Sequence, residues 1–410
     1  MLISKTKVKA KMFISKLSLL ANSFWAIPFV LVVRFIRPWR VVKFGTFASG
    51  RIGHFAADSS IRFAEYNLKV TGERHLYYLP SVTCNSFWSE LVRRNFFVRS
   101  WVRYLLFWNR VIPGGSFHQL ETFNNGSRDI HGSFYKSKKF FQFTHQENAY
   151  AKDWLRQFGW SDGDPFVLLL IRDSKYLACD PLHGDESDVS YKKWDYHSYR
   201  NTEIDSYIPA MEWLASQGAF VLRMGSITDK PLVSDNSKLI DYSFRNDKSA
   251  FLDVWLFANT TLCITTGSGP DMISSACNRP MLVLNYTPIS HCYSWSHALH
   301  APKLLYHRNT QRLLTMREYL SHSFLETELY DQANIQIQDL SRSDILAITQ
   351  ECWNDLHEKF TDDIEHNRIQ DIFWRIIKNS TDDRLNSWIH PRARISLEFL
   401  KLYPTFMDLT

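Results

Sequence analysis

Short apolar runs alternate with segments of helical pattern between residues 166 and 286, and this alternation limits the possible folds more than any other feature. A run such as FVLLLI, which has no polar residue, is typical of a strand that is covered on both faces. Strands separated by helices predict a parallel sheet with right-handed crossovers. The expected strands cover 166–173, 219–225, 238–243, 261–266 and 281–286. The expected helices cover 203–218, 250–259 and 272–277.

The first 160 residues show a similar but weaker pattern. We expect a strand over 41–45, a helix over 53–66, a strand near RHLYYLP and then an amphipathic segment over 87–111. A chain of 410 residues exceeds the size at which a single core stops growing. The sequence therefore predicts an α/β protein of two domains, the second of which is Rossmann-like. The expected boundaries are 1–40 for a basic and apolar segment, 41–160 and 161–340 for the two domains, and 341–410 for a helical region that packs across them.

The N-terminal segment is basic and apolar. Ten of the 48 Lys and Arg residues precede Asp58, whereas none of the 42 Asp and Glu residues does. The uncharged run LSLLANSFWAIPFVLVV (17–33) is shorter than the roughly 20 apolar residues of a membrane-spanning helix. Because basic residues flank it on both sides, we expect it to lie in the membrane interface. A true span and a helix packed on the protein's own core are the alternatives.

Cysteine spacing and charge distribution bear on the compartment and the partners. The six cysteines form no C-x-x-C pair and no Cys/His metal spacing, which favours a reducing compartment. Together with the basic N-terminus, this predicts the cytoplasmic face of the inner membrane. Nucleic-acid binding is disfavoured, because the excess of basic residues is confined to the apolar N-terminal region.

Polar residues follow the expected strands where a doubly wound sheet binds its ligands, beyond the carboxyl ends of the strands. Arginine suits phosphate oxygens because its planar fork donates in pairs, and the loop GSGPD opens a helix whose first N–H groups favour an anion. A Gly-Ser-Gly sequence is also compatible with a plain tight turn. The sequence predicts a phosphorylated ligand held by Arg172, Asp173, Arg223, Gly225, Thr266, Gly267, Ser268, Gly269 and Asp271.

Several nucleotide-binding motifs are missing from the sequence. There is no G-x-x-x-x-G-K-[ST] loop, and GTFASGRIGHF has the wrong glycine spacing for a dinucleotide fingerprint. Asp162 and Asp164 precede a strand, so we interpret them as turn residues instead of metal ligands. We therefore expect no cofactor and no metal, with phosphate charge met by arginines and backbone amides.

Five stretches of the chain together resemble a family of bacterial glycosyltransferases from surface-polysaccharide gene clusters. They are GRIGHFAADSS, LLLIRDSKYL, YRNTEIDSYIPAMEWLASQGAFVLRMGS, IDYS and TTGSGPDMISSACNRPMLVLNYTP. The resemblance covers about 41–66 and 166–290. It implies a GT-B-like pair of Rossmann domains, distantly similar to the O-fucosyltransferases, whose strand-end arginine motif corresponds to Arg172. It also implies sugar transfer from a nucleotide-sugar donor to a membrane-associated or polysaccharide acceptor, without a metal.

Under this hypothesis, the stretch around residues 50–58 faces the acceptor. Gly50 and Gly53 would let the backbone approach a substrate, and Arg51 would hold a phosphate. His54 or Asp58 would act as general base, although a histidine at a helix start is also a common capping or packing residue.

The stretch around residues 176–205 would complete the donor pocket. A nucleotide-sugar epimerase and a non-catalytic carbohydrate-binding scaffold remain alternative functions. The further donor-binding candidates are Tyr176, Tyr199, Arg200, Asn201 and Asp205. Of these, Asp205 could equally interact with a helix dipole.

Overall fold

The structure is a computed structural model. It describes residues 23–68, 72–120, 127–173, 175, 195–357, 364–385 and 387–407.

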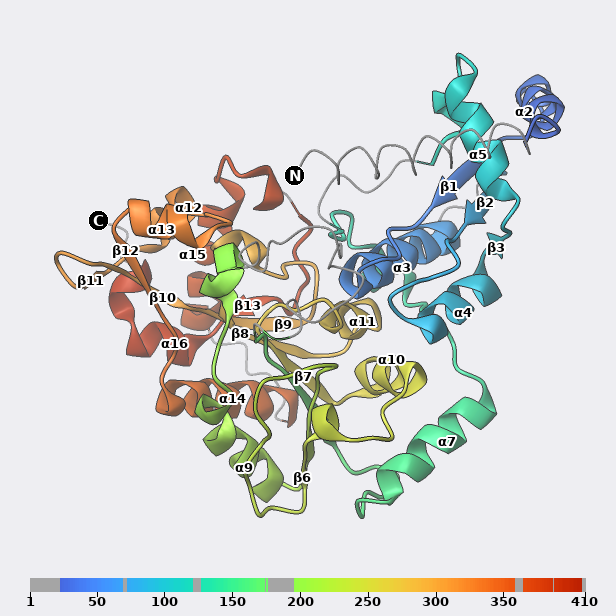
Figure 1. The fold of residues 1–410 in the computed structure, drawn as a ribbon. Helices are drawn as coiled ribbons and strands as arrows, with labels where there is room; N and C mark the ends of the chain where they lie inside the picture. Colours follow the sequence, from blue (N-terminus) through green and yellow to red (C-terminus); the bar gives the residue numbers. More distant parts are fainter. Residues whose placement is uncertain are drawn as a thin grey trace, which may run out of the picture.

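A seven-stranded sheet in which every neighbouring pair is parallel organises the larger part of the molecule (Figure 1). Its strand order is β13-β9-β8-β7-β4-β5-β6, so the chain builds outward from β4 to β6 and then returns to the other side of β4 at β7. The expected α/β class with a parallel sheet is confirmed. The strands are β4 (Phe166–Leu170), β5 (Phe220–Arg223), β6 (Leu239–Ile240), β7 (Leu262–Thr265), β8 (Met281–Tyr286), β9 (Ala298–Pro302) and β13 (Arg394–Ile395).

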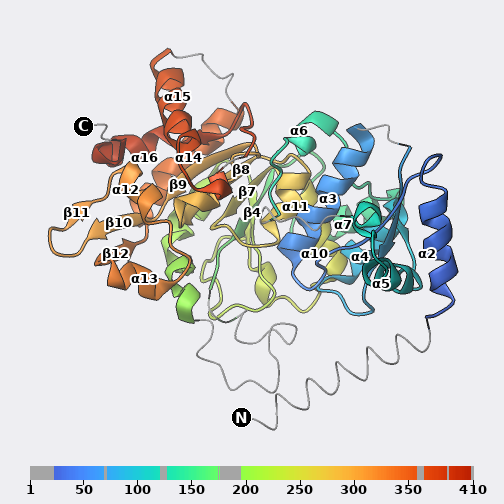
Figure 2. The same ribbon diagram turned by 90° about the horizontal axis from the view of Figure 1, so that it is seen from above.

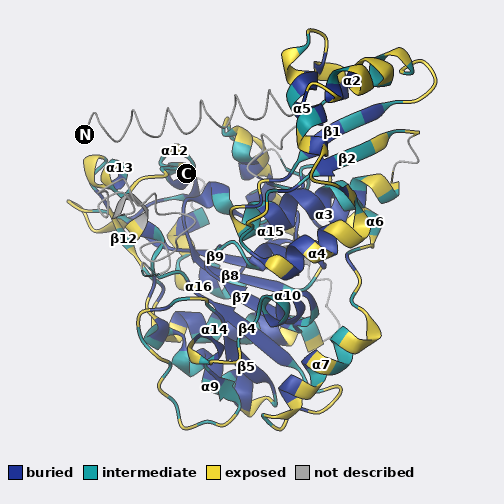
Figure 3. Cartoon of the chain, turned by 45° about the vertical axis from the view of Figure 1, so that its right-hand side comes forward, coloured by how far each residue is buried: buried dark blue, intermediate teal, exposed yellow. Residues whose placement is uncertain are grey.

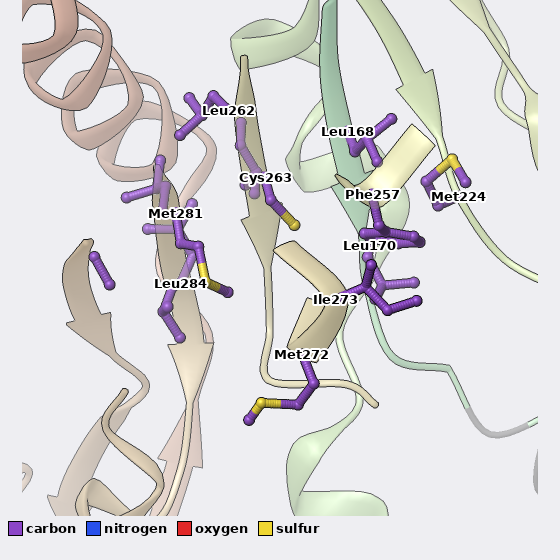
Figure 4. Close-up of a cluster of buried hydrophobic side chains, with 14 of the residues drawn as sticks. Leu168, Leu170, Met224, Phe257, Leu262, Cys263, Met272, Ile273, Met281 and Leu284 are labelled. Atoms are coloured by element: carbon purple, nitrogen blue, oxygen red, sulfur yellow. The ribbon is translucent and has the colours of Figure 1, made fainter. Parts of the chain in front are cut away.

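The apolar runs of the sequence form the centre of this sheet because both of its faces are covered. Every residue of β4, β5, β7 and β8 is buried. Figure 4 shows Leu168, Cys263 and Met281 from neighbouring strands in one buried cluster with Phe257 and Ile273 of the covering helices. The helices that accompany the sheet are α9 (Ile208–Ser216), α10 (Ala250–Asn259), α11 (Asp271–Ala276) and α14 (Arg342–His357).

A smaller parallel sheet with the order β1-β2-β3 lies beyond α10 and α11 (Figure 2). The expected single segment over 87–111 is two helices, because β3 separates them. Helices α3 and α4 pack between the two sheets, whereas α2 and α5 cover the outer side of the small sheet. The elements are α2 (Ala26–Phe35), β1 (Val42–Thr46), α3 (Ile52–Leu68), β2 (Arg74–Tyr78), α4 (Ser86–Asn95), β3 (Phe97–Val98) and α5 (Val102–Val111).

The rest of the chain packs around these two sheets. Strands β10 and β12 pair in antiparallel fashion in a third sheet with β11, and β13 brings the C-terminal region back to the edge of the large sheet beside β9. These elements are α6 (Ser133–Ser137), α7 (His145–Arg156), β10 (Leu304–His307), β11 (Arg312–Leu313), α12 (Met316–Ser321), α13 (Thr327–Gln332), β12 (Ile335–Gln338), α15 (Ile364–Lys378) and α16 (Leu397–Leu402).

One hydrophobic core extends through both sheets. Phe55, Trp88 and Phe141 of the N-terminal half belong to the same buried cluster as Val167 and Leu282 of the large sheet. A second, smaller cluster joins α2 and α5 to the outer side of the small sheet. Among the described residues, no helix is both long and apolar enough to cross a membrane.

Candidate functional site

A cavity of about 780 Å³ lies between the N-terminal half and the large-sheet half of the molecule. One side is formed by the start of α3, with Arg51 and His54. The other side is formed by the segments that follow β4 and β7, with Arg172 and Ser268. Strands β4 and β7 are neighbours on either side of the point where the strand order reverses, which is where doubly wound sheets bind ligands.

Two glycines allow the backbones of the two halves of the molecule to pack in close contact. A Cβ atom on Gly53 would lie 2.9 Å from the Cα of Gly269, and a Cβ on Gly269 would lie 3.0 Å from the backbone N of Gly53. Both residues also line the cavity. At Gly50, by contrast, an added Cβ meets no protein atom within 4 Å, so Gly50 makes no close contact of this kind with the protein, and its predicted approach to a substrate stays a prediction. Gly53 is needed for contact with the second half of the protein itself.

Asp271 fixes the conformation of the Gly-Ser-Gly loop through hydrogen bonds. Its carboxylate accepts hydrogen bonds from the hydroxyl of Thr265 (2.7 Å) and the backbone N–H of Ser268 (2.9 Å). The hydroxyl of Tyr293 donates to the same carboxylate at 3.1 Å. Complete burial raises the pKa of Asp271 to about 6. Asp271 therefore positions the loop, whereas Thr266, Gly267, Ser268 and Gly269 line the cavity.

Four arginines gather around His291 in this cavity. Burial lowers the pKa of His291 well below its usual value, and the positive charges of Arg200, Arg128, Arg384 and Arg172 lower it further. All five residues line the cavity. Histidine is therefore neutral here, and the surrounding guanidinium groups favour the binding of an anion.

Each arginine of this cluster comes from a different segment. Arg172 follows β4, and its backbone N–H donates to the hydroxyl of Thr266 at 3.0 Å. Arg200 donates to the carbonyl of Gly267. Both were expected at the donor site. The other two arginines of the cluster lie in irregular segments, so the rule that ligands bind beyond the ends of strands does not predict them.

Arg128 and Arg384 are the two arginines that the sequence did not indicate. Arg128 donates to the carbonyl oxygens of Ser290 and Arg384, so it joins the N-terminal half to the C-terminal region. Burial lowers the pKa of Arg128. The guanidinium of Arg384 pairs with Asp382, with 2.7 Å between Nη2 and Oδ2.

The start of α3 brings His54 into the cavity. Its Nδ1 lies 2.6 Å from the hydroxyl oxygen of Ser127, a residue with a left-handed backbone (φ 60°). Burial lowers the pKa of His54, and the charge of Arg51 lowers it further. Neutral His54 is thus the form present near pH 7, which is the form that accepts a proton.

Asp58 lies one turn further along α3 and is buried beneath the cavity wall. Burial raises the pKa of Asp58 to about 6, although a hydrogen bond from Ser127 and the charge of Arg62 act in the opposite direction. Ser127 therefore interacts with both of the predicted general-base candidates. Only His54 of the two lines the cavity.

The structure places Arg223 away from the cavity. Its side chain is 1% exposed, and its Nη1 lies 2.5 Å from the carbonyl of Lys230 and 3.3 Å from the carboxylate of Asp241. The structure therefore gives no support to the expected phosphate contact, because Arg223 is buried and is not among the residues that line the cavity. Gly225, two residues later, does line the cavity.

Other predicted donor residues also have structural partners elsewhere. The ring of Tyr199 packs 5.6 Å from that of Tyr330, and the carbonyl of Asn201 accepts from Lys303 at 2.6 Å. Asp205 pairs with Lys230 at 2.9 Å. None of the three lines the cavity. Tyr176 lies outside the described residues.

Asp173 lines the cavity and organises the segment after β4. Its carboxylate accepts from the backbone N–H of Lys175 at 3.0 Å and from that of Asp229 at 3.2 Å. Within the described ranges, no three His, Cys, Asp or Glu side chains are grouped as a metal site. Among the described residues that line the cavity, the arginines and the backbone amides of the loop are groups that can bind phosphate oxygens.

Comparisons with known proteins give weak similarities. No protein-family model and no curated protein matches the chain. The E. coli ADP-heptose LPS heptosyltransferase II has 14% identity and a TM-score of 0.35, over 64% of this chain and 90% of that one. A glycosyl transferase family 9 structure from Veillonella parvula has 11% identity and a TM-score of 0.43, over 78% and 97%. Similarity at this level carries no weight for function, which has to be inferred from the site.

Proposed function

We propose that the protein is a metal-independent glycosyltransferase with a GT-B-like arrangement, which takes a sugar from a nucleotide-sugar donor. We propose bacterial surface-carbohydrate biosynthesis as its setting, with a glycan or lipid-linked acceptor. The observation that carries the proposal is the cluster of Arg128, Arg172, Arg200 and Arg384 in one cavity with the Gly-Ser-Gly loop. The resemblance of the sequence to surface-polysaccharide transferases supports sugar transfer over other uses of a phosphorylated ligand.

In this proposal the diphosphate of the donor lies among the four arginines. A cavity of about 780 Å³ is within the usual range for small-molecule sites, roughly 300–1,000 Å³. Charge grows on the diphosphate as the bond between the sugar and phosphate breaks. Fixed guanidinium groups stabilise that growing charge without a metal ion, and they do so more strongly in a partly enclosed site than in water.

His54 is the proposed general base. Its Nδ1 is occupied by Ser127, so Nε2 is the atom that accepts the proton of the acceptor hydroxyl. The acceptor oxygen forms a bond to the anomeric carbon of the sugar, and the nucleoside diphosphate leaves with the electron pair of the broken bond. Asp58, whose carboxylate interacts with Ser127, helps to orient this arrangement.

Donor titration by calorimetry tests the proposal directly. The wild type should bind one of the UDP-, GDP- or dTDP-sugars, which carry a diphosphate. Arg172→Ala should weaken that binding about ten- to a hundredfold, because a charge-assisted hydrogen bond contributes roughly 1.5–3 kcal/mol. Arg172→Lys should restore the affinity only partly, since the paired fork contact is lost. Arg308→Ala is the matched control, because this arginine pairs with Asp331 outside the cavity.

The outcomes separate the proposed function from its alternatives. Unchanged affinity in both Arg172→Ala and Arg200→Ala would contradict the donor site, and a wild type that binds no nucleotide sugar would favour the scaffold. His54→Ala should keep donor affinity and lose about 10²- to 10⁴-fold in transfer rate. Release of an altered nucleotide sugar in the absence of acceptor would instead identify an epimerase.

A further inference from the structure

Helix α2 presents an apolar surface to the outside of the molecule. Its inner side, with Ala26 and Val30 fully buried, packs on α5 and the small sheet. A helix on a protein surface normally carries polar residues on its outer side. Figure 3 shows that the outer edge of α2 is exposed, and the large side chains exposed there are apolar. We call this the α2 face; its residues are Phe24, Trp25, Phe29, Leu31, Val32 and Phe35, with Trp39 just beyond.

The degree of exposure on the α2 face is unusual for large side chains. Phe35 is 75% exposed and Trp39 is 76% exposed, while Phe29 is 58% exposed. These side chains follow one another along the same helix and the turn after it, so they form one patch. Contiguous apolar surface of this kind marks a site of association with a partner or a membrane.

The single charged residue of α2 does not interrupt this patch. Arg34 turns toward the segment after α5, where Nη1 lies 2.6 Å from the carbonyl of Pro113 and Nη2 lies 2.9 Å from that of Ile112. These contacts fix α2 against the body of the protein. The hydroxyl of Ser23 adds a further attachment, because it accepts from the indole N–H of Trp108 at 2.9 Å. The aromatic residues are therefore held outward by a well-anchored helix.

The outer layer that α2 and α5 form together also carries exposed arginines. Arg37 and Arg40 follow α2, and Arg103 and Arg110 are exposed on α5. The sequence has no Asp or Glu between residues 1 and 57 or between residues 91 and 120. The guanidinium of Arg37 lies 3.6 Å from the ring centre of Phe117, and that of Arg103 lies 4.5 Å from the ring centre of Tyr104. The outer layer thus combines aromatic rings with positive charge.

We propose that the α2 face docks on a lipid bilayer that contains anionic lipid. Aromatic side chains would enter the boundary between headgroups and acyl chains, while the arginines contact the anionic headgroups. Ten helical residues extend about 15 Å, half of the roughly 30 Å hydrocarbon core, so α2 lies along the surface. A second copy of the chain fits less well, because pairing two such faces would bring their arginines together. This inference is independent of the proposed sugar transfer.

Vesicle sedimentation with the full chain tests this docking. We expect wild-type protein to sediment with vesicles of phosphatidylcholine and phosphatidylglycerol, and much less with phosphatidylcholine alone. The triple variant Phe29→Ser, Phe35→Ser, Trp39→Ser should bind the mixed vesicles at least about tenfold more weakly, because it removes the apolar contribution to interfacial binding. Arg37→Gln with Arg40→Gln should reduce the preference for anionic vesicles.

A matched control replaces exposed apolar side chains elsewhere. The triple variant Tyr150→Ser, Val233→Ser, Leu402→Ser changes residues of similar exposure outside the α2 face and should bind as the wild type does. Failure of the wild type to bind either vesicle would overturn the proposal. So would an α2-face variant that binds like the wild type, or a wild-type dimer that the α2-face variant dissociates. None of these outcomes affects the calorimetric test of donor binding.

Discussion

Ser127 connects two side chains that stand one turn apart on α3. Its hydroxyl lies 2.6 Å from Nδ1 of His54, and its hydrogen bond to Asp58 lowers the pKa of that carboxyl against the effect of burial. The left-handed backbone of Ser127 is uncommon outside glycine and is found where surrounding contacts require it. A single serine in an irregular segment carries no periodicity or spacing signal, so the sequence could not indicate it.

Replacing Asp58 by Asn should change how stability depends on pH. Burial raises the pKa of Asp58 to about 6 from an ordinary value of 3.8, so ionisation of the folded protein is penalised. The stabilising effect of the neutral carboxyl is complete below pH 3.8 and is lost as the pH rises through about 6. Asparagine does not ionise. The variant should therefore gain up to about 3 kcal/mol in unfolding free energy relative to the wild type between pH 4 and pH 7.5.

Urea unfolding of both proteins at the two pH values measures this difference. Asp371→Asn is the control, because it removes an exposed carboxylate of α15, and its difference from the wild type should stay within about 0.5 kcal/mol. If the difference in unfolding free energy between Asp58→Asn and the wild type is equal at both pH values, Asp58 is not held in its neutral form.

The candidate site was predictable where it follows regular strands. Arg172 and the loop 266–269 come directly after β4 and β7, and the rule that ligands bind beyond strand ends identified them. The structure does not support the same rule at Arg223, which also ends a strand. The sequence does not reveal that its guanidinium bonds to Lys230 and Asp241, since those partners are brought together only by the folded segment after β5.

At the scale of elements, the contact between α3 and the Gly-Ser-Gly loop should be sensitive to one methyl group. Gly53→Ala would place a Cβ 2.9 Å from the Cα of Gly269, and backbone cannot move aside as a flexible side chain does. Overpacking of this kind costs about 1–3 kcal/mol. Alanine favours a helix over glycine by up to about 1 kcal/mol, which offsets only part of the cost. We expect a lower melting temperature for Gly53→Ala.

Thermal unfolding followed by circular dichroism checks this expectation. Gly50→Ala is the matched control three residues earlier, because an added Cβ meets nothing within 4 Å there, and its melting temperature should be close to that of the wild type. Equal melting temperatures for Gly53→Ala and Gly50→Ala would mean that the start of α3 and the Gly-Ser-Gly loop separate easily.

Element boundaries followed the strength of the sequence signal. The helix over 250–259 and the strand over 281–286 match α10 and β8, because each is a clear apolar pattern bounded by turn residues. The sequence predicts one continuous segment over 87–111, since Phe96 and Phe97 keep it apolar across the break at β3. Strand β13 has two residues and is too short to show any period, so the sequence does not indicate the returning edge strand. The third sheet is likewise missing from the sequence prediction, although its strands β10 and β12 have four residues each.

The core that the two halves share should make unfolding of the protein cooperative. Phe141 and Trp160 of the N-terminal half belong to the same cluster as Phe166 of the large sheet, and the indole of Trp255 donates to Asn148 at 2.9 Å. Domains with separate cores generally unfold in separate transitions. We therefore expect a single calorimetric transition, with a calorimetric enthalpy close to the van't Hoff enthalpy. Two resolved transitions would show that the contacts between the halves are weak.

The hydrogen bonds of Arg128 limit how freely one half of this protein can be exchanged for the corresponding half of a related protein. A chimaera joined near residue 160 would take Arg128 from one parent and the carbonyls of Ser290 and Arg384 from the other. Even with every residue after β4 retained, the exchanged half would have to supply an arginine at this position to rebuild the cluster around His291. Exchange of the N-terminal half, which contains neither β4 nor the Gly-Ser-Gly loop, would therefore alter the anion site.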